Sequence, residues 1–251
     1  MTTRAHDVIV FAHGWGYDPS FFNPLIEALQ REHADWFNQC LVVALDQGYF
    51  SKSGEGALKV WDQSAWIPHP AETLHGLVMG HSEAHWEGVG HSLGFAHLLA
   101  YAIKWRKLVS VAGFTHFCSQ GDLPGTAPRV LQRMVTQLKT DPAGVLTAFQ
   151  QRAGYLPMHT PTLPSTLNAH HPLLHDLESM LTLNCADTLT KLLNHGVQVL
   201  AIEQPGDPIV EHTMAGRLHR LTVTNAPHSE LARNPSRYTQ ALVDFLKQDA
   251  S

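Results

Sequence analysis

The pentapeptide 90–94, Gly-His-Ser-Leu-Gly, places a serine between two glycines. A short apolar stretch around Val89 precedes it, and an apolar helical pattern over 93–104 follows it. Flanking glycines permit a turn so tight that the serine takes a strained backbone conformation and exposes its hydroxyl. We therefore predict that Ser92 is a nucleophile, and the alternative is a glycine-rich turn without chemistry. Ser82 lacks the second glycine and follows a helical pattern, which makes it a weaker candidate.

A serine nucleophile needs a base and an acid, and both residue types occur after later predicted strands. Asp207 follows the apolar stretch 197–202, and His228 follows the next such stretch. The chain order serine, acid, histidine is typical of hydrolases with this kind of nucleophile turn. His228 would take the serine proton and return it to the leaving group, while Asp207 would hold the imidazole tautomer. Glu203 and Asp187 remain alternative acids, and the alternative for His228 is a surface histidine.

The loop 13–16, His-Gly-Trp-Gly, directly follows the first apolar stretch of the chain. In proteins with a nucleophile turn of this kind, that loop supplies one backbone N–H to the oxyanion hole, and the residue after the serine supplies the other. We therefore predict Trp15 and Leu93 as the two donors. Each donor contributes about 3 kcal/mol to the transition state when it points at the oxyanion. The alternative is an ordinary glycine turn beside a core tryptophan.

The elements that must position these groups alternate between strand and helix. Short continuous apolar stretches predict buried strands, and apolar residues spaced three and four apart predict helices. This alternation predicts the α/β class, with a mostly parallel sheet covered on both faces by helices. The predicted strands are 8–12, 41–45, a weak one at Val89, 108–112, 197–202 and 218–224, and the predicted helices include 19–34, 72–79, 93–104 and 237–248.

The alternation stops near Phe114, and helical patterns without a convincing strand continue to about Cys185. Val130, Met134 and Leu138 have helical spacing, for example. We interpret 114–185 as a helical lid inserted over the carboxyl edge of the sheet. The core domain would then consist of 1–113 and 186–251.

Composition excludes several other classes of protein. The 251 residues suit one domain, and 44% hydrophobic with 16% charged residues argues against disorder. A net charge of −5 argues against nucleic-acid binding, which needs clustered Lys and Arg. No apolar run approaches the roughly 20 residues of a membrane helix. We expect a monomer.

Three cysteines in no recognisable spacing favour a reduced, cytoplasmic compartment. His81 and His85 have the spacing of helical metal ligands, and His170 and His171 are adjacent, but neither pair has an accompanying carboxylate motif. We therefore predict no metal and no cofactor.

Together these motifs resemble the lidded α/β-hydrolases. The segment after the fourth strand resembles more particularly the pimeloyl-[acyl-carrier protein] methyl ester esterase family of biotin synthesis. The resemblance there rests on 117–119 (Phe-Cys-Ser), 122–125 (Asp-Leu-Pro-Gly), 130–131 (Val-Leu) and 149–152 (Phe-Gln-Gln-Arg). It implies a carboxylesterase that forms an acyl-enzyme, with the same triad and oxyanion donors.

The resemblance also implies contacts with the substrate. We expect Trp15, Phe114 and Phe149 to contact a small acyl ester, which could be attached to acyl carrier protein. In that family the lid carries basic residues that bind the acidic carrier. The basic residues in the matching region here are Arg129, Arg133, Lys139 and Arg152. A solvated helix face is the alternative for this group.

Two departures from the family pattern concern the pocket. Phe95 stands where a further glycine usually follows the serine turn, and 48–50 (Gly-Tyr-Phe) replaces the usual loop after the second strand. The open alternatives are a generic short-chain carboxylesterase, a thioesterase, a lactone hydrolase or a carbon–carbon hydrolase of the same fold. A catalytically silent binding module is the alternative from a different class. Dehalogenases and epoxide hydrolases are disfavoured, because they resemble this pattern but place Asp at position 92.

Overall fold

The computed structural model describes residues 7–51, 53–71, 73–155, 157, 163–210 and 214–248. Within these residues, eight strands form one sheet in the order β4-β3-β2-β1-β5-β6-β7-β8. The strands β1, β2, β5, β6, β7 and β8 pair in parallel, and β3 pairs antiparallel with both β2 and β4. This confirms the predicted mostly parallel sheet. The strands are β1 (Asp7–Ala12), β2 (Cys40–Asp46), β3 (Ala57–Asp62), β4 (Ala65–Pro68), β5 (His85–His91), β6 (Trp105–Val111), β7 (Gln198–Glu203) and β8 (His219–Thr222).

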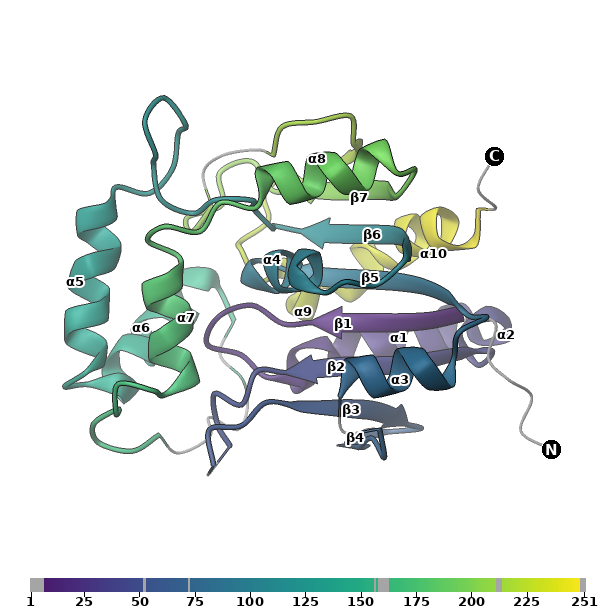
Figure 1. The fold of residues 1–251 in the computed structure, drawn as a ribbon, viewed down its shortest axis with the longest axis horizontal. Coiled ribbons are helices and arrows are strands. Elements are labelled where there is room, and N and C mark those ends of the chain that lie inside the picture. Colours follow the sequence, from purple (N-terminus) through teal and green to yellow (C-terminus); the bar gives the residue numbers. More distant parts are fainter. Residues whose placement is uncertain are drawn as a thin grey trace.

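Helices cover both faces of the sheet (Figure 1). Alternate residues of the central strand β1 enter different cores: Val8 and Val10 pack on one face, and Ile9 and Phe11 on the other. Such double burial explains why the parallel strands are continuously apolar in sequence. One face is covered by α3 (Leu74–Gly80), α4 (Leu93–Ala100) and α8 (Ala186–Asn194), and the other by α1 (Asn23–Glu32), α9 (Glu230–Arg233) and α10 (Thr239–Lys247).

Three further helices gather beyond the carboxyl ends of the parallel strands, at the left of Figure 1. They are α5 (Pro128–Leu138), α6 (Pro142–Ala153) and α7 (Pro172–Ser179), and each has a proline in its first turn. Proline suits that position because its missing N–H would have no helical partner there. All three belong to the segment 114–185, whose role as a lid stays a prediction.

Several element boundaries differ from the sequence-based expectations. The hairpin of β3 and β4 was not predicted. The helix after the serine ends at Ala100, because Tyr101 is extended and the chain must enter β6 at Trp105. The helix predicted at 19–34 consists of a 3-10 turn, η1 (Pro19–Phe22), then α1, then α2 (Ala34–Phe37) after a break at His33. The final helix α10 follows a second 3-10 turn, η2 (Pro235–Arg237).

The histidine spacing that resembles helical metal ligands is not realised on one helix. His81 is the residue after α3, and His85 is the first residue of β5. Of the described helices, none has the length and apolar character needed to cross a bilayer.

A buried carboxyl group lies where the central strands meet the carboxyl end of α10. Glu87 of β5 is fully buried and pairs with the guanidinium of Arg106. Arg106 also donates to the Leu246 carbonyl (3.0 Å), and the Lys107 ammonium donates to that of Phe245 (2.7 Å). Burial outweighs the attraction of Arg106 and raises the pKa of Glu87 to about 7. The side chain therefore stays protonated in the folded protein at pH values, below about 7, at which an ordinary glutamate is ionised.

This raised pKa predicts a pH-dependent gain in stability for Glu87→Gln. A carboxyl whose folded pKa exceeds its unfolded pKa stabilises the fold fully below the unfolded pKa, near 4.5, and loses that contribution as the pH rises through about 7. Glutamine does not ionise, so the melting temperature of the variant relative to wild type should increase from pH 5 to pH 8. Thermal unfolding at both values tests this, and a difference that is constant or reversed would contradict it.

Candidate active site

Ser92 lies in the sharp turn between β5 and α4. Its backbone has φ 54° and ψ −125°, a left-handed conformation that costs a non-glycine residue energy. A Cβ on Gly94 would overlap the carbonyl of Ala12, and one on Gly90 would overlap the backbone of Phe95. Both glycines are therefore required by close approach, as expected for a turn that presents a nucleophile.

The structure brings Asp207 and His228 together beside this turn. His228 Nδ1 lies 2.7 Å from Asp207 Oδ2, and both side chains are buried. The other carboxylate oxygen accepts the N–H groups of Ile209 (2.7 Å) and Val210 (3.1 Å). With Nδ1 donating to the acid, His228 Nε2 is the atom left to accept a proton, and it has no partner among the described residues. The ring of His91, next to the serine, lies 4.8 Å from that of His228.

The loop predicted to form the oxyanion hole contacts the serine. A Cβ on Gly14 would lie 2.9 Å from that of Ser92. His13 holds this loop, since its Nδ1–H donates to the Gly14 carbonyl (3.0 Å) and its Nε2 accepts the Gln47 N–H (3.2 Å). Burial lowers the pKa of His13, which agrees with this neutral tautomer. Within the described residues, the N–H groups of Trp15 and Leu93 donate to no backbone carbonyl, as oxyanion donors must.

The aromatic side chains predicted to contact substrate lie in one apolar cluster near the serine. The Trp15 ring meets the Phe149 ring edge-on, with centroids 4.9 Å apart, and Trp15 Nε1 donates to the Leu173 carbonyl of α7 (2.7 Å). Phe114 is fully buried in the same cluster, together with Leu93. The structure thus places all three predicted aromatic residues around the carboxyl edge of the sheet.

Helix α6 is tied to each of the catalytic loops, a feature that the sequence analysis missed. Gln150 Nε2 donates to the Gly16 carbonyl of the oxyanion loop (2.8 Å), and Arg152 Nε donates to the Pro208 carbonyl of the acid turn (3.2 Å). The Ala153 carbonyl accepts the N–H of Ser229, the residue after the base (3.0 Å). The one signal in the sequence was Gln150, a polar residue at the helical spacing of the buried residues Leu146 and Ala153.

The four basic residues proposed to bind a carrier do not form one group. Lys139 is ion-paired with Glu178 (2.9 Å), and Arg152 donates to the Pro208 carbonyl in the turn that contains Asp207. Arg129 and Arg133 are exposed on α5, and neither is paired with a carboxylate among the described residues. They are the two that are free to meet a partner.

The remaining sequence-based candidates lie elsewhere. Glu203 is ion-paired with Arg220, and Asp187 is an exposed residue in the first turn of α8. Phe95 is fully buried in the core on the α4 face of the sheet and not in the aromatic cluster. Tyr49, by contrast, does lie in that cluster, and its hydroxyl donates to Asp176 of α7 (2.5 Å).

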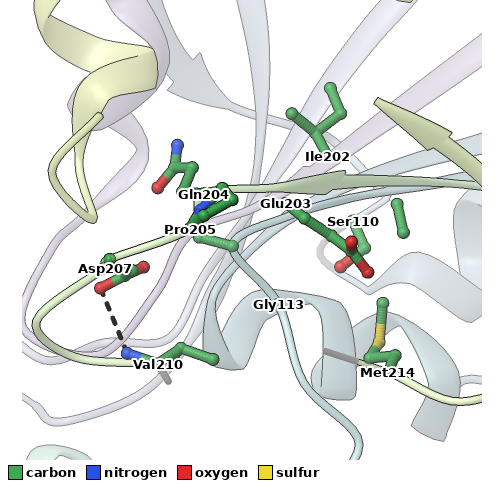
Figure 2. A pocket seen from close by; sticks show the side chains of 12 residues that line it. Ser110, Gly113, Ile202, Glu203, Gln204, Pro205, Asp207, Val210 and Met214 are labelled. Carbon is green, nitrogen blue, oxygen red and sulfur yellow. Dashed lines mark hydrogen bonds between the residues drawn. The ribbon is translucent and has the colours of Figure 1, made fainter. Parts of the chain in front are cut away.

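A cavity of about 270 Å³ lies at the ends of β6 and β7, beside Asp207 (Figure 2). Its lining includes Ser110, Glu203, Asp207 and Met214 but not the serine of the turn. The Asp207 carboxylate that accepts the Val210 N–H forms part of its wall. We therefore do not assign the acyl group to this cavity.

The order of the strands, the turn at Ser92 and the positions of the acid and histidine define the class: the chain has the α/β-hydrolase fold. Its sequence is similar to the pimeloyl-[acyl-carrier protein] methyl ester esterase of Sodalis glossinidius (strain morsitans), with 27% identity over 257 residues, 94% of this chain and 92% of that protein. No family model matches the chain.

Solved structures show the same fold at low identity. One is from work on carboxylesterases of Nitrososphaera gargenis, with a TM-score of 0.63 and 14% identity over 98% of this chain and 92% of that one. Another is the enol-lactonase of Burkholderia xenovorans LB400, with a TM-score of 0.61 and 14% identity over 96% of this chain and 92% of that one. Both support the fold that the motifs predicted.

Substitution of the acid should separate Asp207 from its two alternatives. Asp207→Asn keeps the shape of the side chain but no longer holds the productive imidazole tautomer, so kcat for an activated ester should fall about 10³- to 10⁴-fold. Glu203→Gln and Asp187→Asn should leave kcat within about threefold, because neither carboxylate is bonded to His228. A large loss in either control, with Asp207→Asn active, would show that the acid is misassigned.

Proposed function

We propose that this chain is a serine carboxylesterase that works through an acyl-enzyme on Ser92. It is a carboxylic ester hydrolase whose base and acid are His228 and Asp207. The observation that carries this proposal is the buried 2.7 Å contact between Nδ1 of the histidine and the acid, beside a serine held at φ 54°. The sequence similarity to an esterase over nearly the whole chain supports the same activity.

The reaction follows from the atoms that the structure leaves available. Ser92 Oγ attacks the ester carbonyl while Nε2 of His228 takes its proton, and Asp207 stabilises the imidazolium. The N–H groups of Trp15 and Leu93 bind the oxyanion. The histidine then protonates the departing alcohol, which leaves an acyl-serine. Water, deprotonated by the same histidine, attacks the acyl-serine, and the histidine returns that proton to Ser92 Oγ as the carboxylic acid leaves. Apart from the substrate and water, the groups that take part in these steps are side chains and backbone N–H groups of this chain.

The substrate that we propose is a pimeloyl methyl ester on acyl carrier protein, and the role is in biotin synthesis. The named relative acts on that ester. An aromatic cluster of Trp15, Phe114 and Phe149 offers apolar contacts for a mid-length acyl chain. Arg129 and Arg133 lie one helical turn apart on exposed α5, where they suit an acidic carrier. The free cysteines Cys40, Cys118 and Cys185 suit a reducing compartment, and we propose that the protein is a monomer in the cytoplasm.

A covalent test decides between an enzyme and a silent binding module. A fluorophosphonate should label wild type at Ser92, and wild type should hydrolyse p-nitrophenyl butyrate. Ser92→Ala should lose the label and at least about 10³-fold of the activity, because no other group replaces the nucleophile. Ser82→Ala, which alters the other Gly-His-Ser turn, is the matched control and should behave as wild type. Absence of label from folded wild type would contradict the esterase proposal.

The substrate has its own genetic test. A biotin-requiring strain that lacks its esterase should grow when it expresses wild type and not when it expresses Ser92→Ala. Soluble, ester-cleaving protein that fails to restore growth would favour a generic carboxylesterase instead.

Reversal of charge on α5 tests whether an acyl carrier protein docks on this helix. Arg129→Glu with Arg133→Glu should lower kcat/KM for the carrier-bound ester about tenfold or more, since steering and contact both depend on opposite charge. Activity on p-nitrophenyl butyrate should change less than about twofold. Lys191→Glu with Arg217→Glu makes the same change in net charge at exposed sites away from α5 and is the matched control. Equal losses on both esters, or equal losses in both double variants, would contradict carrier docking on α5.

A further inference from the structure

His91, the residue before the serine in the turn, is fully buried at the end of β5. One face of its ring is stacked on Phe21, with centroids 4.3 Å apart and planes 26° apart. The ring of His228 lies 4.8 Å from it. A Cβ on Gly14 would come within 2.9 Å of Nδ1 of His91, so the oxyanion loop also packs against this ring. His91 therefore contacts the base and the oxyanion loop while its own backbone carries the nucleophile turn.

The hydrogen bonding of His91 fixes its tautomer. Nε2 lies 3.0 Å from the backbone carbonyl of His228, and a carbonyl only accepts, so Nε2 carries the proton. Nδ1 has no partner among the described residues and is the unprotonated nitrogen. Burial and the neighbouring His228 lower the pKa of His91 well below its usual value. The ring is thus a neutral donor, and it adds no positive charge beside the imidazolium that forms during the reaction.

The peptide unit that joins His228 to Ser229 is held at both of its polar atoms. Its carbonyl accepts from His91 Nε2, and its N–H donates to the Ala153 carbonyl of α6 (3.0 Å). The Ser229 hydroxyl is in turn bonded to Tyr17 Oη (3.0 Å). Fixing this peptide plane fixes the direction in which the imidazole of residue 228 leaves the backbone.

A second side chain reaches the same carbonyl from the acid turn. With Gln204 Oε1 accepting from Tyr238 Oη (2.9 Å), Gln204 Nε2 donates to the carbonyls of Pro227 (3.1 Å) and His228 (3.2 Å). The backbone carbonyl of Gln204 also accepts the N–H of Asp207 (3.0 Å). The nucleophile turn and the acid turn therefore meet at the carbonyl of the base.

We propose that His91 is a positioning residue that sets the orientation of the catalytic base through the backbone carbonyl of His228. This role rests on the proposed esterase function and deepens it. The donor matters for catalysis because an imidazole displaced by a fraction of an ångström can no longer accept the serine proton efficiently. The stacked ring alone would contribute stability without setting this direction.

The test compares substitutions that separate the ring from the donor. His91→Phe keeps the stack on Phe21 and removes the donor, whereas His91→Gln keeps an N–H that can reach the carbonyl. His91→Asn has the same amide on a side chain that is one methylene too short. His116→Phe is the matched control, because this buried histidine also contacts a backbone carbonyl through Nε2 (Pro124, 2.8 Å) but away from the triad.

We expect His91→Phe and His91→Asn to lower kcat on p-nitrophenyl butyrate about tenfold or more, with KM within about threefold. His91→Gln should retain kcat within about threefold of wild type. His116→Phe should lower the melting temperature without a comparable loss of kcat. The proposal is overturned if His91→Phe retains the wild-type kcat, or if His91→Gln falls as far as His91→Asn.

A measurement without turnover keeps this inference separate from the esterase proposal. The downfield NMR resonance of the His228 Nδ1 proton reports its bond to Asp207. The resonance should be sharp in wild type, His91→Gln and His116→Phe, and broadened or shifted in His91→Phe. An unchanged resonance in His91→Phe would overturn the positioning role even if wild type had no esterase activity. Inactive wild type in which His91→Phe alters the resonance would contradict the esterase proposal only.

Discussion

The proposed active site depends on Ser92, which is held in a left-handed backbone conformation at the end of β5. A residue in this conformation costs about 1–3 kcal/mol, and it persists only where its surroundings leave no alternative. The surroundings here are rigid, since β5 lies between β1 and β6 at the centre of the sheet and α4 begins at once. Glycines at 90 and 94 remove the two Cβ atoms that would block this approach. The strained turn is therefore imposed by the packing of the fold.

Given that turn, the remaining groups are positioned by contacts between loops. Asp207 is held by backbone N–H groups of its own turn, and the peptide after His228 is held from two sides. Helix α6 contacts the predicted oxyanion, acid and histidine loops through three residues of its last turn, Gln150, Arg152 and Ala153. A helix so anchored is part of the scaffold of the proposed active site.

Local signals were enough to predict the centre of the fold and its motifs. Glycine spacing and continuous apolar strands are properties of adjacent residues, so β1, β2, β5, β6 and β7 and the serine turn could be found from sequence. The hairpin at 57–68 was missed because β3 and β4, at one edge of the sheet, are partly exposed and lack a continuous apolar run. The bonds of His91, Gln150 and Gln204 join residues more than twenty positions apart, and no local pattern reveals such pairs. The four basic residues predicted to bind a carrier protein do not act as one set in the structure. Lys139, for example, is ion-paired with Glu178 of α7, a contact that the local sequence around Lys139 does not reveal.

We propose that an acyl group is transferred to Ser92 and then to water. Mass spectrometry of protein quenched during turnover of dimethyl pimelate, followed by peptide mapping, tests this directly. An added acyl mass should appear on the peptide that contains Ser92 and should disappear as substrate is exhausted. Ester hydrolysis by wild type with no such adduct, and with undiminished activity in Ser92→Ala, would contradict it.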